Sequence, residues 1–352
     1  MKVAVLVSGG VDSSVALKLL LDQGHDCTAF YLKIWLEDEL ASLGTCPWEE
    51  DLTYVRAVCE QLDVPLNIVN LQKEYWERVV SYVLREVKQG RTPNPDVLCN
   101  EQVKFGAFFD SITGSFDKVA SGHYADIEEK EGVFFLRRVK DPVKDQTYFL
   151  ANLRQDQLCR IIFPLAPYTK SQVRAIAKEA DLPTMDRKDS QGICFLGKIN
   201  YDEFLTHYLG EKEGELVEWE TKNVIAKHKG FWHYTLGQRK GIAHHAGPWY
   251  VVGKDVQKNI VFISNKYHEQ PPRDSFIVTD VHWIATTPKF DDNLRVKFRH
   301  RPGLYACNIL ERDDGSLHVT IDGNDQGIAP GQFAVFYDET YCYGCGVIAD
   351  AP

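Results

Sequence analysis

A glycine-rich segment near the start of the chain has the composition of a phosphate-binding loop. It runs over residues 8–14 with the sequence SGGVDSS and contains the adjacent glycines Gly9 and Gly10. An apolar, β-branched stretch, 3–7, precedes it, and an apolar stretch with helical spacing, 15–21, follows it. Between a strand and a helix, a glycine pair allows a tight turn whose N–H groups converge on an anion, and the helix N-terminus adds partial positive charge. The segment therefore predicts a site for the phosphates of a nucleotide.

This segment differs from the commonest phosphate loop. A Walker A loop ends in Gly-Lys-Ser/Thr, and that ending is missing here. The pattern SGGxDS instead resembles the pyrophosphate loop of ATP pyrophosphatases. Those enzymes split ATP between the α and β phosphates to give an adenylated substrate and pyrophosphate. A glycine-rich turn with no ligand is the structural alternative.

Two cysteines lie inside distinctive local sequences. Cys99 belongs to NPDVLCN (94–100), where Asp96 precedes the thiol by three residues, and Cys194 belongs to DSQGICF (189–195), just after a glycine. A cysteine acts as a nucleophile through its thiolate, whereas most single cysteines are small buried hydrophobes. The motifs make both thiols candidates for covalent chemistry, and their distance apart in sequence says nothing about contact.

Together with further motifs, these segments resemble one family. The motifs are SGGVDSS at 8–14, TPNPDVLCN at 92–100, SGHYA at 121–125, KDQTYFL at 144–150, KDSQGICF at 188–195, TLGQRKG at 235–241, and PGQ with AVFY at 330–337. Because they occur in one order over almost the whole chain, the sequence is identified as a member of the tRNA-specific 2-thiouridylases. Those enzymes replace the C2 oxygen of the wobble uridine of certain tRNAs with sulfur.

The resemblance implies a role for each thiol. Cys194 matches the cysteine that carries the persulfide, and Cys99 matches the cysteine that assists the release of sulfur. ATP adenylates the uracil C2 oxygen, and the persulfide sulfur attacks C2 directly or after release as sulfide. A Cys99–Cys194 disulfide would remain, to be reduced before the next turnover. Asn94, Pro95 and Asp96 match the segment at the target base, where Asp96 would act as a base or simply cap the turn.

The resemblance also implies an ATP site around the glycine-rich segment. Its contacts fall on Leu6, Val7, Ser8, Gly9, Gly10, Val11, Asp12, Ser13, Leu32 and Gly122. Mg²⁺ is expected to accompany the triphosphate, and Asp12 would help to hold it or would order the loop. The family's usual Lys-Asn-Trp stretch is replaced by 33–35 and a longer segment, 36–47. This departure leaves the lip of the adenine pocket and the role of Cys46 open.

Two macromolecular partners are implied, a tRNA and a persulfide donor protein of the cysteine desulfurase or sulfur-relay type. The implied tRNA contacts are His123, Lys144, Asp145, Gln146, Arg299, His300 and Gln332. A basic tract from Arg295 to Arg301 alternates with Val296 and Phe298, so a strand there would place its basic side chains on one face. The structural alternatives are a solvated strand face and, for His123, an ordinary pocket histidine.

The order of predicted elements indicates an α/β protein followed by a β-rich tail. Strands over 28–34, 66–71 and 118–121 alternate with helices over 51–62, 75–87, 103–112 and 170–180, which predicts a doubly wound parallel sheet of the adenine-nucleotide-hydrolase type. Ligands of such sheets bind at the carboxyl ends of the strands. Short strands over 249–252, 260–263, 276–278, 294–298, 318–321 and 333–337 predict a small β-barrel. We expect a catalytic domain (1–205), a connecting module (206–270) and a barrel that contacts tRNA (271–352).

The composition is that of a globular intracellular protein. The 352 residues are 44% hydrophobic, and no apolar run approaches the ~20 residues that a membrane span requires. Nine cysteines in a chain of this length indicate a reducing compartment, so we expect a cytoplasmic protein, with an organellar origin and a removed transit peptide left open. The formal charge of −10 argues against nucleic acid only weakly, because phosphates are bound by local basic patches.

Some motifs and functions remain as alternatives. Cys342 and Cys345 form a CxxC, but a single pair lacks the second pair of a tetrahedral zinc site, so we expect strand packing and no metal site. Another pyrophosphate-loop enzyme, or an RNA-binding protein that senses ATP without catalysis, would share part of the pattern. The first would lack the two cysteine motifs, and the second would be expected to lose the loop's Asp or a motif cysteine.

Overall fold

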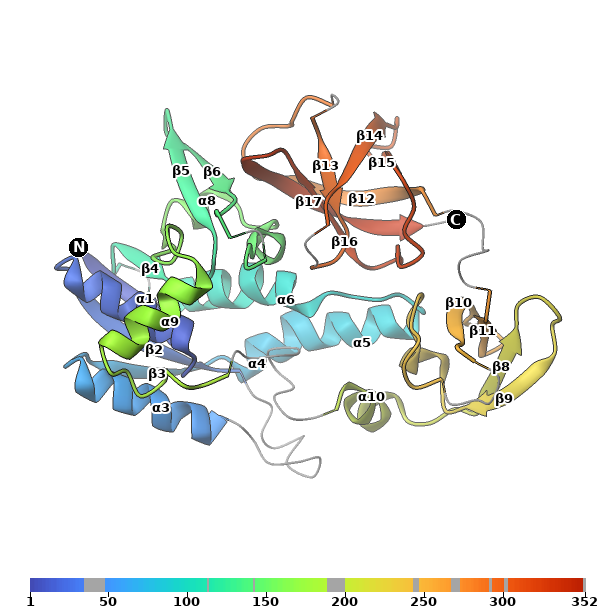
Figure 1. Cartoon of the computed structure of the whole chain (residues 1–352), viewed down its shortest axis with the longest axis horizontal. Helices are drawn as coiled ribbons and strands as arrows, with labels where there is room; N and C mark the ends of the chain where they lie inside the picture. Colours follow the sequence, from blue (N-terminus) through green and yellow to red (C-terminus); the bar gives the residue numbers. More distant parts are fainter. Residues whose placement is uncertain are drawn as a thin grey trace.

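A five-stranded parallel sheet forms the centre of the N-terminal part of the computed structural model, which describes residues 1–34, 48–112, 114–141, 143–188, 200–242, 247–266, 273–290, 293–300 and 303–350. Its order is β3-β2-β1-β4-β7, with bounds β1 (Lys2–Leu6), β2 (Asp26–Lys33), β3 (Leu66–Asn70), β4 (Lys118–Ala120) and β7 (Ile161–Ile162). Every pairing within it is parallel. This confirms the predicted doubly wound sheet (Figure 1).

Helices cover both faces of this sheet. Alternate residues of β1 point to opposite faces, and because both sets are apolar, each face is buried under helices. Val3 and Val5 pack with α1 (Val11–Asp22) and α3 (Trp48–Gln61), and α1 in turn packs with α9 (Lys170–Glu179). Ala4 and Leu6 face the other side, where the long helices of residues 72–111 lie. The central strand is accordingly buried on both faces, as its unbroken apolar sequence requires.

The helices of residues 72–111 contain two π-helical segments that the sequence pattern did not predict. The predicted helix 75–87 is α4 (Gln72–Tyr75), η2 (Trp76–Val80) and α5 (Ser81–Lys88) in succession. The predicted helix 103–112 begins earlier, as α6 (Pro95–Leu98), η3 (Cys99–Ala107) and α7 (Phe108–Ser111). Pro95 occupies the first turn, which suits its fixed φ and missing N–H, and Asn94 Oδ1 accepts a hydrogen bond from Asp96 N at 3.1 Å. The proline-rich turn of the sequence is thus the start of the helix that carries Cys99.

The C-terminal part is a closed antiparallel barrel, as predicted. Its strands are β12 (Ser275–Trp283), β13 (Arg295–Lys297), β14 (Tyr305–Glu311), β15 (Leu317–Ile321), β16 (Phe333–Tyr337) and β17 (Tyr341–Asp350), and pairing of β12 with β17 closes it. A hairpin of the N-terminal part, β5 (Asp126–Lys130) and β6 (Val133–Arg137), extends the barrel sheet through β17. The barrel core includes Phe276, Val296, Val319 and Phe336. The hairpin makes the two domains share one sheet.

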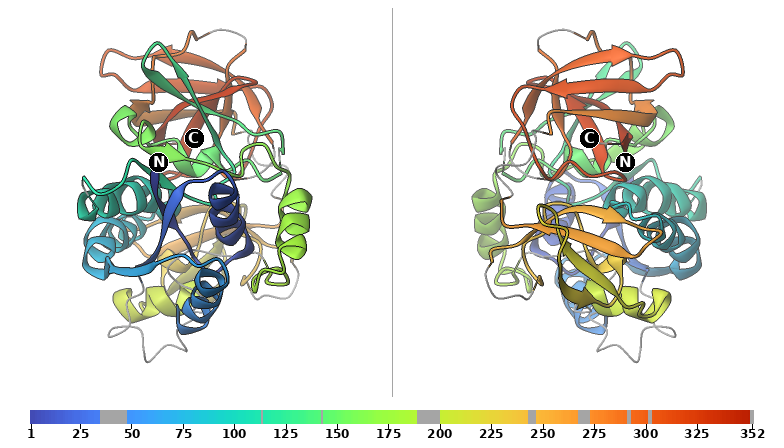
Figure 2. Two further views of the ribbon diagram at one scale, coloured as in Figure 1. Left: turned by 90° about the vertical axis from the view of Figure 1, so that its left-hand side faces the viewer. Right: turned by 90° about the vertical axis from the view of Figure 1, so that its right-hand side faces the viewer.

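A smaller central module lies between these domains in sequence and beside both in space. It contains α10 (Tyr201–Leu209), η5 (Phe231–His233) and a sheet in the order β10-β11-β8-β9, with β8 (Gly214–Glu218), β9 (Val224–His228), β10 (Tyr250–Asp255) and β11 (Ile260–Ser264). The predicted strands 249–252 and 260–263 are β10 and β11 of this sheet, so the prediction that they form part of the barrel is wrong. From the right-hand side the module lies in front of the catalytic domain and below the barrel (Figure 2).

Two short helices, η4 (Thr147–Leu150) and α8 (Gln155–Leu158), connect the hairpin to β7. Among the helices that the structure describes, none is long and apolar enough to cross a membrane.

Candidate nucleotide and thiol site

The glycine-rich segment forms the predicted turn between β1 and α1. Gly9 has φ +75°, and a Cβ there would lie 2.6 Å from the carbonyl oxygen of Asp51, so only glycine fits. Gly10 caps α1 without a side-chain hydrogen bond, so no side chain caps the helix N-terminus. Ser13 Oγ accepts a hydrogen bond from Ser8 N and donates one to Gly10 O, both at 3.1 Å, which closes the loop on itself. This arrangement suits an anion at the N-terminus of α1.

The acidic residue of the loop is held by two other segments of the catalytic domain. Lys170 Nζ lies 2.6 and 2.8 Å from the two carboxylate oxygens of Asp12, and Tyr124 Oη donates to Oδ1 at 2.8 Å. Gly122 lies directly against the loop, since a Cβ there would be 2.7 Å from Ser13 N. Leu32 lies near the carboxyl end of β2, paired with Val69 of β3. The residues predicted to contact ATP therefore gather at one edge of the sheet.

Sequence reasoning missed two cations at this edge, Lys170 and Arg187. Arg187 donates from Nη1 to Gly9 O at 2.6 Å and from Nη2 to Asp51 Oδ1 at 2.8 Å, and its guanidinium lies 4.3 Å from the ring centroid of Tyr54. It thereby ties the loop to α3. No spacing in the sequence links either cation to the loop, because both contacts bridge segments more than a hundred residues apart.

Cys99 is buried as a thiol in this structure. It opens the π-helical segment η3 and is 1% exposed. Burial raises the pKa of its thiol to about 11; Lys104 opposes this rise and Asp96 adds to it. Cys194, its predicted partner, lies outside the described residues, as do Cys46 and Arg301. The predicted pairing of the two thiols therefore stays a prediction.

The segment predicted to lie at the target base presents an unpaired acceptor. Asp96 Oδ1 is buried and has no hydrogen-bond partner among the residues that the structure describes. Burial lowers the pKa of the nearby barrel residue His300, and the charges of Asp145 and Asp96 only partly oppose that shift. His300 Nε2 lies 3.2 Å from Asp145 O, and the imidazole lies against the ring of Phe149 with centroids 4.5 Å apart. The barrel thus meets the N-terminal domain through the contacts of His300 with Asp145 and Phe149.

Some residues predicted to contact tRNA are structural in their resting positions. Asp145 is 2% exposed, and its carboxylate accepts hydrogen bonds from Arg138 Nε at 3.0 Å and Thr147 Oγ1 at 2.6 Å. Gln146 Oε1 accepts a hydrogen bond from Tyr124 N at 2.9 Å. Lys144 is half-buried. The side chain of Gln146 thus joins this segment to Tyr124 at the nucleotide site, and that of Asp145 joins it to Arg138 at the end of the hairpin.

The expectation of a continuous basic strand face is wrong. The strand β13 covers only Arg295–Lys297, and Lys297 is 5% exposed, with the pKa of its ammonium lowered by burial. Arg299 lies beyond the strand and forms an ion pair with Asp325. Alternation placed Arg295 and Lys297 on one side, but Lys297 is buried near Asp145 rather than exposed to water.

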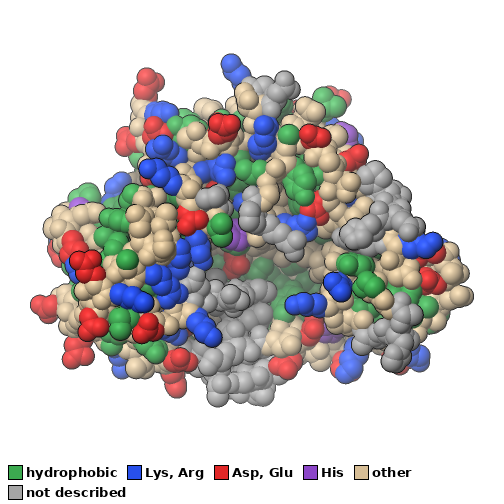
Figure 3. Space-filling view, viewed as in Figure 1, with side chains coloured by type: hydrophobic (Ala, Val, Ile, Leu, Met, Phe, Trp, Pro, Cys, Tyr) green, Lys and Arg blue, Asp and Glu red, His purple; other side chains and the backbone are tan. Residues whose placement is uncertain are grey.

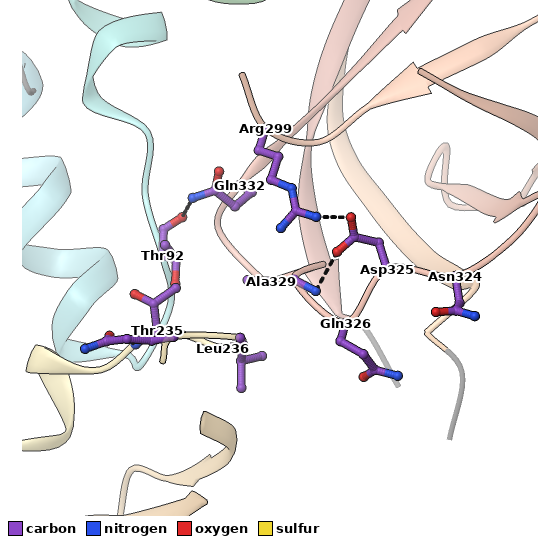
Figure 4. Close-up of a pocket in the computed structure, with 12 residues that line it drawn as sticks. Thr92, Thr235, Leu236, Arg299, Asn324, Asp325, Gln326, Ala329 and Gln332 are labelled. Carbon is purple, nitrogen blue, oxygen red and sulfur yellow. Dashed lines mark hydrogen bonds and ion pairs between the residues drawn. The ribbon is translucent and has the colours of Figure 1, made fainter. Parts of the chain in front are cut away.

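A polar pocket of about 550 Å³ lies where the three domains meet (Figure 4). It is lined by Thr92, Thr235, Leu236, Gly237, Gln238, Arg299, Asn324, Asp325, Gln326, Gly327, Ala329 and Gln332. Gln332 Nε2 donates to Thr92 O at 2.9 Å, and Thr92 N donates to Pro330 O at 2.7 Å. Two predicted tRNA contacts, Arg299 and Gln332, therefore border a pocket whose wall continues into the segment of Asp96.

Three family models match the chain one after another. They are described as a tRNA methyl transferase HUP domain (residues 1–198), a tRNA methyl transferase PRC-barrel domain (202–265) and an aminomethyltransferase beta-barrel domain (273–348). Curated relatives named tRNA-specific 2-thiouridylase MnmA, from Porphyromonas gingivalis and Parabacteroides distasonis, are 43% identical over 99% of this chain and 99% of their own. A Bacteroides thetaiotaomicron relative, named tRNA-specific 2-thiouridylase MnmA 1, matches to the same extent. The chain belongs to the tRNA-specific 2-thiouridylase family.

Solved structures resemble this family member only in part. An NMN synthetase from Francisella tularensis is 19% identical with a TM-score of 0.36, covering 57% of this chain and 71% of its own. A 4-thiouridine synthetase in complex with RNA and bound ATP is also 19% identical, with a TM-score of 0.34. The match covers 56% of this chain and 46% of the synthetase chain.

Two further motifs of this 2-thiouridylase family member are largely covered by the protein. His123 Nδ1 lies 2.8 Å from Ser121 Oγ, its ring packs against those of Phe105 and Phe163, and desolvation lowers the pKa of the imidazole well below its usual value. Cys342 and Cys345 lie in β17, and burial raises the pKa of both thiols. Within the described part of the chain, no three His, Cys, Asp or Glu side chains are grouped as metal ligands.

Proposed function

We propose that this protein is an ATP-dependent sulfurtransferase that converts the wobble uridine of tRNA to 2-thiouridine and releases AMP and pyrophosphate. The observation that carries the proposal is the end-to-end similarity to relatives named tRNA-specific 2-thiouridylase, at 43% identity. The geometry supports it, because an anion-binding loop and a buried cysteine lie in one domain whose neighbour is a barrel.

The loop has the features that a triphosphate requires. The N-terminus of α1 has no side-chain cap, and Gly9 and Gly122 leave no room for a side chain where backbone approaches backbone. Phosphate oxygens can therefore reach the N–H groups of the first turn. Mg²⁺, bound with ATP, would neutralise part of the triphosphate charge.

The chemistry proceeds in two substitutions that involve the base and a third at sulfur. In the first, the uracil C2 oxygen attacks the α phosphorus of ATP, and the bond to pyrophosphate breaks. In the second, the terminal sulfur of a Cys194 persulfide attacks C2 and AMP leaves. The Cys99 thiolate then attacks Cys194 Sγ, the sulfur–sulfur bond breaks, and sulfur stays on the base while a Cys99–Cys194 disulfide forms. A persulfide donor protein reloads Cys194 after a dithiol reductant has opened the disulfide.

Asp96 is suited to act at the base. Its Oδ1 is a buried acceptor without a hydrogen-bond partner among the described residues, and an unpaired buried acceptor is costly unless a ligand satisfies it. The N3–H of a uracil would be such a donor. The oxygen would orient the base while C2 is adenylated.

The deciding experiment is nucleoside mass spectrometry of tRNA incubated with the full-length protein, ATP, Mg²⁺ and a persulfide donor. We expect 2-thiouridine, with AMP and pyrophosphate formed in step with it. Cys194→Ser should abolish thiolation, whereas Cys159→Ser should leave it intact, because Cys159 Sγ only donates to Asp156 O on the turn after α8. ADP and phosphate as the main products, or unmodified tRNA with full ATP consumption, would overturn the proposal.

A further inference from the structure

A lysine at the start of α9 faces the nucleotide loop without belonging to any motif discussed above. Thr169 caps α9 with a capping box completed by Gln172, which fixes Lys170 as the first helical residue. The side chain of Lys170 is 14% exposed, so protein atoms cover most of it. A charged group that is largely covered in this way is favoured by an anionic partner.

Asp12 supplies one such partner and fixes the position of the ammonium. Lys170 Nζ contacts both carboxylate oxygens, at 2.6 and 2.8 Å, and the Tyr124 hydroxyl donates to the same carboxylate at 2.8 Å. Tyr124 is 1% exposed, and its ring centroid lies 6.0 Å from Lys170 Nζ. A rigid phenol therefore holds the carboxylate, and the carboxylate holds the ammonium.

Lys170, Asp12 and Tyr124 together lie where an anionic ligand would bind. Asp12 lies in the first turn of α1, beside the helix N-terminus where phosphates would bind. A bare carboxylate there would repel a triphosphate, whereas the ion pair removes that repulsion and leaves a cation at the edge of the loop. An ammonium is a compact charge that can contact a carboxylate and a phosphate oxygen together.

We propose that Lys170 binds the pyrophosphate part of ATP, and that Asp12 and Tyr124 are positioning residues for its ammonium. The inference rests on the proposed function, which makes ATP the ligand of this loop. Cleavage between the α and β phosphates leaves negative charge on pyrophosphate, and a fixed ammonium stabilises that charge without having to reorganise. Asp12 then acts chiefly on Lys170 rather than as a ligand of Mg²⁺.

Isothermal titration calorimetry of the full-length protein with inorganic pyrophosphate, ATP or AMP, each with Mg²⁺, tests this directly. Lys170→Gln should weaken pyrophosphate and ATP on the order of 10- to 100-fold, the cost of one charge-assisted hydrogen bond, and leave AMP nearly unchanged. Lys178→Gln is the matched control, because Lys178 lies exposed in the last turn of the same helix. Equal weakening of AMP and pyrophosphate by Lys170→Gln would overturn the assignment.

A double variant separates binding from simple charge neutralisation. If Lys170 only neutralised Asp12, Asp12→Asn combined with Lys170→Gln would restore wild-type affinity for ATP. We expect the double variant to bind as weakly as Lys170→Gln, and restoration would overturn the inference.

Thermal unfolding identifies variants that have lost the fold, and Tyr124→Phe, which keeps the buried ring, supplies a second, milder displacement of the ammonium. Wild-type protein that binds neither ATP nor pyrophosphate would refute the proposed function itself, whereas unchanged affinity in Lys170→Gln would refute only this inference.

Discussion

At the scale of single residues, burial rather than motif chemistry sets the state of Cys99. A thiol with a pKa of about 11 is almost entirely protonated near pH 7, although it is the thiolate that attacks sulfur. Asp96 raises this pKa further and Lys104 lowers it, so the two residues act on the thiol in opposite directions. Substrate entry that exposes Cys99 to water or displaces Asp96 would lower the barrier to forming the thiolate.

The alkylation rate of Cys99 by iodoacetamide should report this balance. In wild-type protein the rate should still rise about tenfold per pH unit between pH 8 and pH 10, because thiolate is the reactive form and the pKa lies above this range. Asp96→Asn should increase the rate at a fixed pH by lowering the pKa, and Lys104→Met should decrease it. Mass spectrometry of the Cys99 peptide gives the rate, with urea-unfolded protein as the reference. A plateau below pH 9 in the folded protein would contradict this account.

Replacing each of the two cysteines should block a different step of the reaction. Cys194→Ser should end sulfur transfer because a hydroxyl cannot carry a persulfide, while adenylation of the tRNA, measured as tRNA-dependent release of pyrophosphate, still occurs. Cys99→Ser should stop multiple turnover but leave Cys194 able to accept labelled sulfur from the donor. Mass spectrometry of wild-type protein after one turnover without reductant should find the disulfide, which requires Cα atoms about 4.4–6.8 Å apart. Two free thiols beside an equal amount of thiolated tRNA would exclude that step.

At the scale of elements, strands and amphipathic helices could be predicted from sequence, but the π-helical segments could not. Apolar runs and glycines located β1 to within a residue at each end and the last turn of α1, because buried residues are apolar, but α1 begins at Val11, four residues before the predicted stretch. The i→i+5 hydrogen bonds of η3 have no signature in the spacing of apolar residues, although η3 contains both Cys99 and Lys104. Likewise, the sequence around Lys170 and Arg187 does not predict their contacts with the glycine-rich loop, because those contacts depend on how distant segments pack.

Gly122 tests how closely two elements must approach at the nucleotide site. A Cβ there would lie 2.7 Å from Ser13 N, so Gly122→Ala must push the 121–125 segment away from α1. We expect a loss of roughly 1–3 kcal/mol in the free energy of unfolding and weaker ATP binding. Gly303→Ala is the control, because a Cβ at Gly303 has no heavy atom within 4 Å and should change stability by less than about 0.5 kcal/mol. Equal urea midpoints and ATP affinities for the two variants would show that the contact is loose.

At the scale of the whole molecule, basic side chains are concentrated around one hollow of a protein whose net charge is negative. Lys and Arg side chains lie around the hollow below the barrel, between the N-terminal part and the central module (Figure 3), while the formal charge of the chain is −10. The order of sheet and barrel could be predicted from the periodicity of the sequence. The burial of Lys297 could not, because alternation tells which side chains share a face but not whether that face meets water or the hairpin region of another domain.

Binding of tRNA should therefore depend on salt through a few groups at this hollow rather than through a whole basic strand. Replacing Arg299 with Gln should reduce the slope of log affinity against log salt by about one, the effect of one lost phosphate contact. The variant should stay folded, because Asp325 keeps hydrogen bonds from Tyr305 Oη at 2.9 Å and Gly327 N at 2.8 Å. Lys144→Gln, at a second predicted contact, should add a similar reduction.

Lys18→Gln supplies the control for this measurement, because Lys18 pairs with Asp22 near the end of α1 that lies away from the nucleotide loop. Filter binding of tRNA between about 50 and 200 mM salt resolves slopes that differ by one. An Arg299→Gln slope equal to those of wild type and Lys18→Gln would mean that Arg299 stays bound to Asp325 in the complex. The three-domain pocket would then contact the RNA through its amide side chains instead, and those contacts would carry little salt dependence because no counterion is released when a neutral group binds.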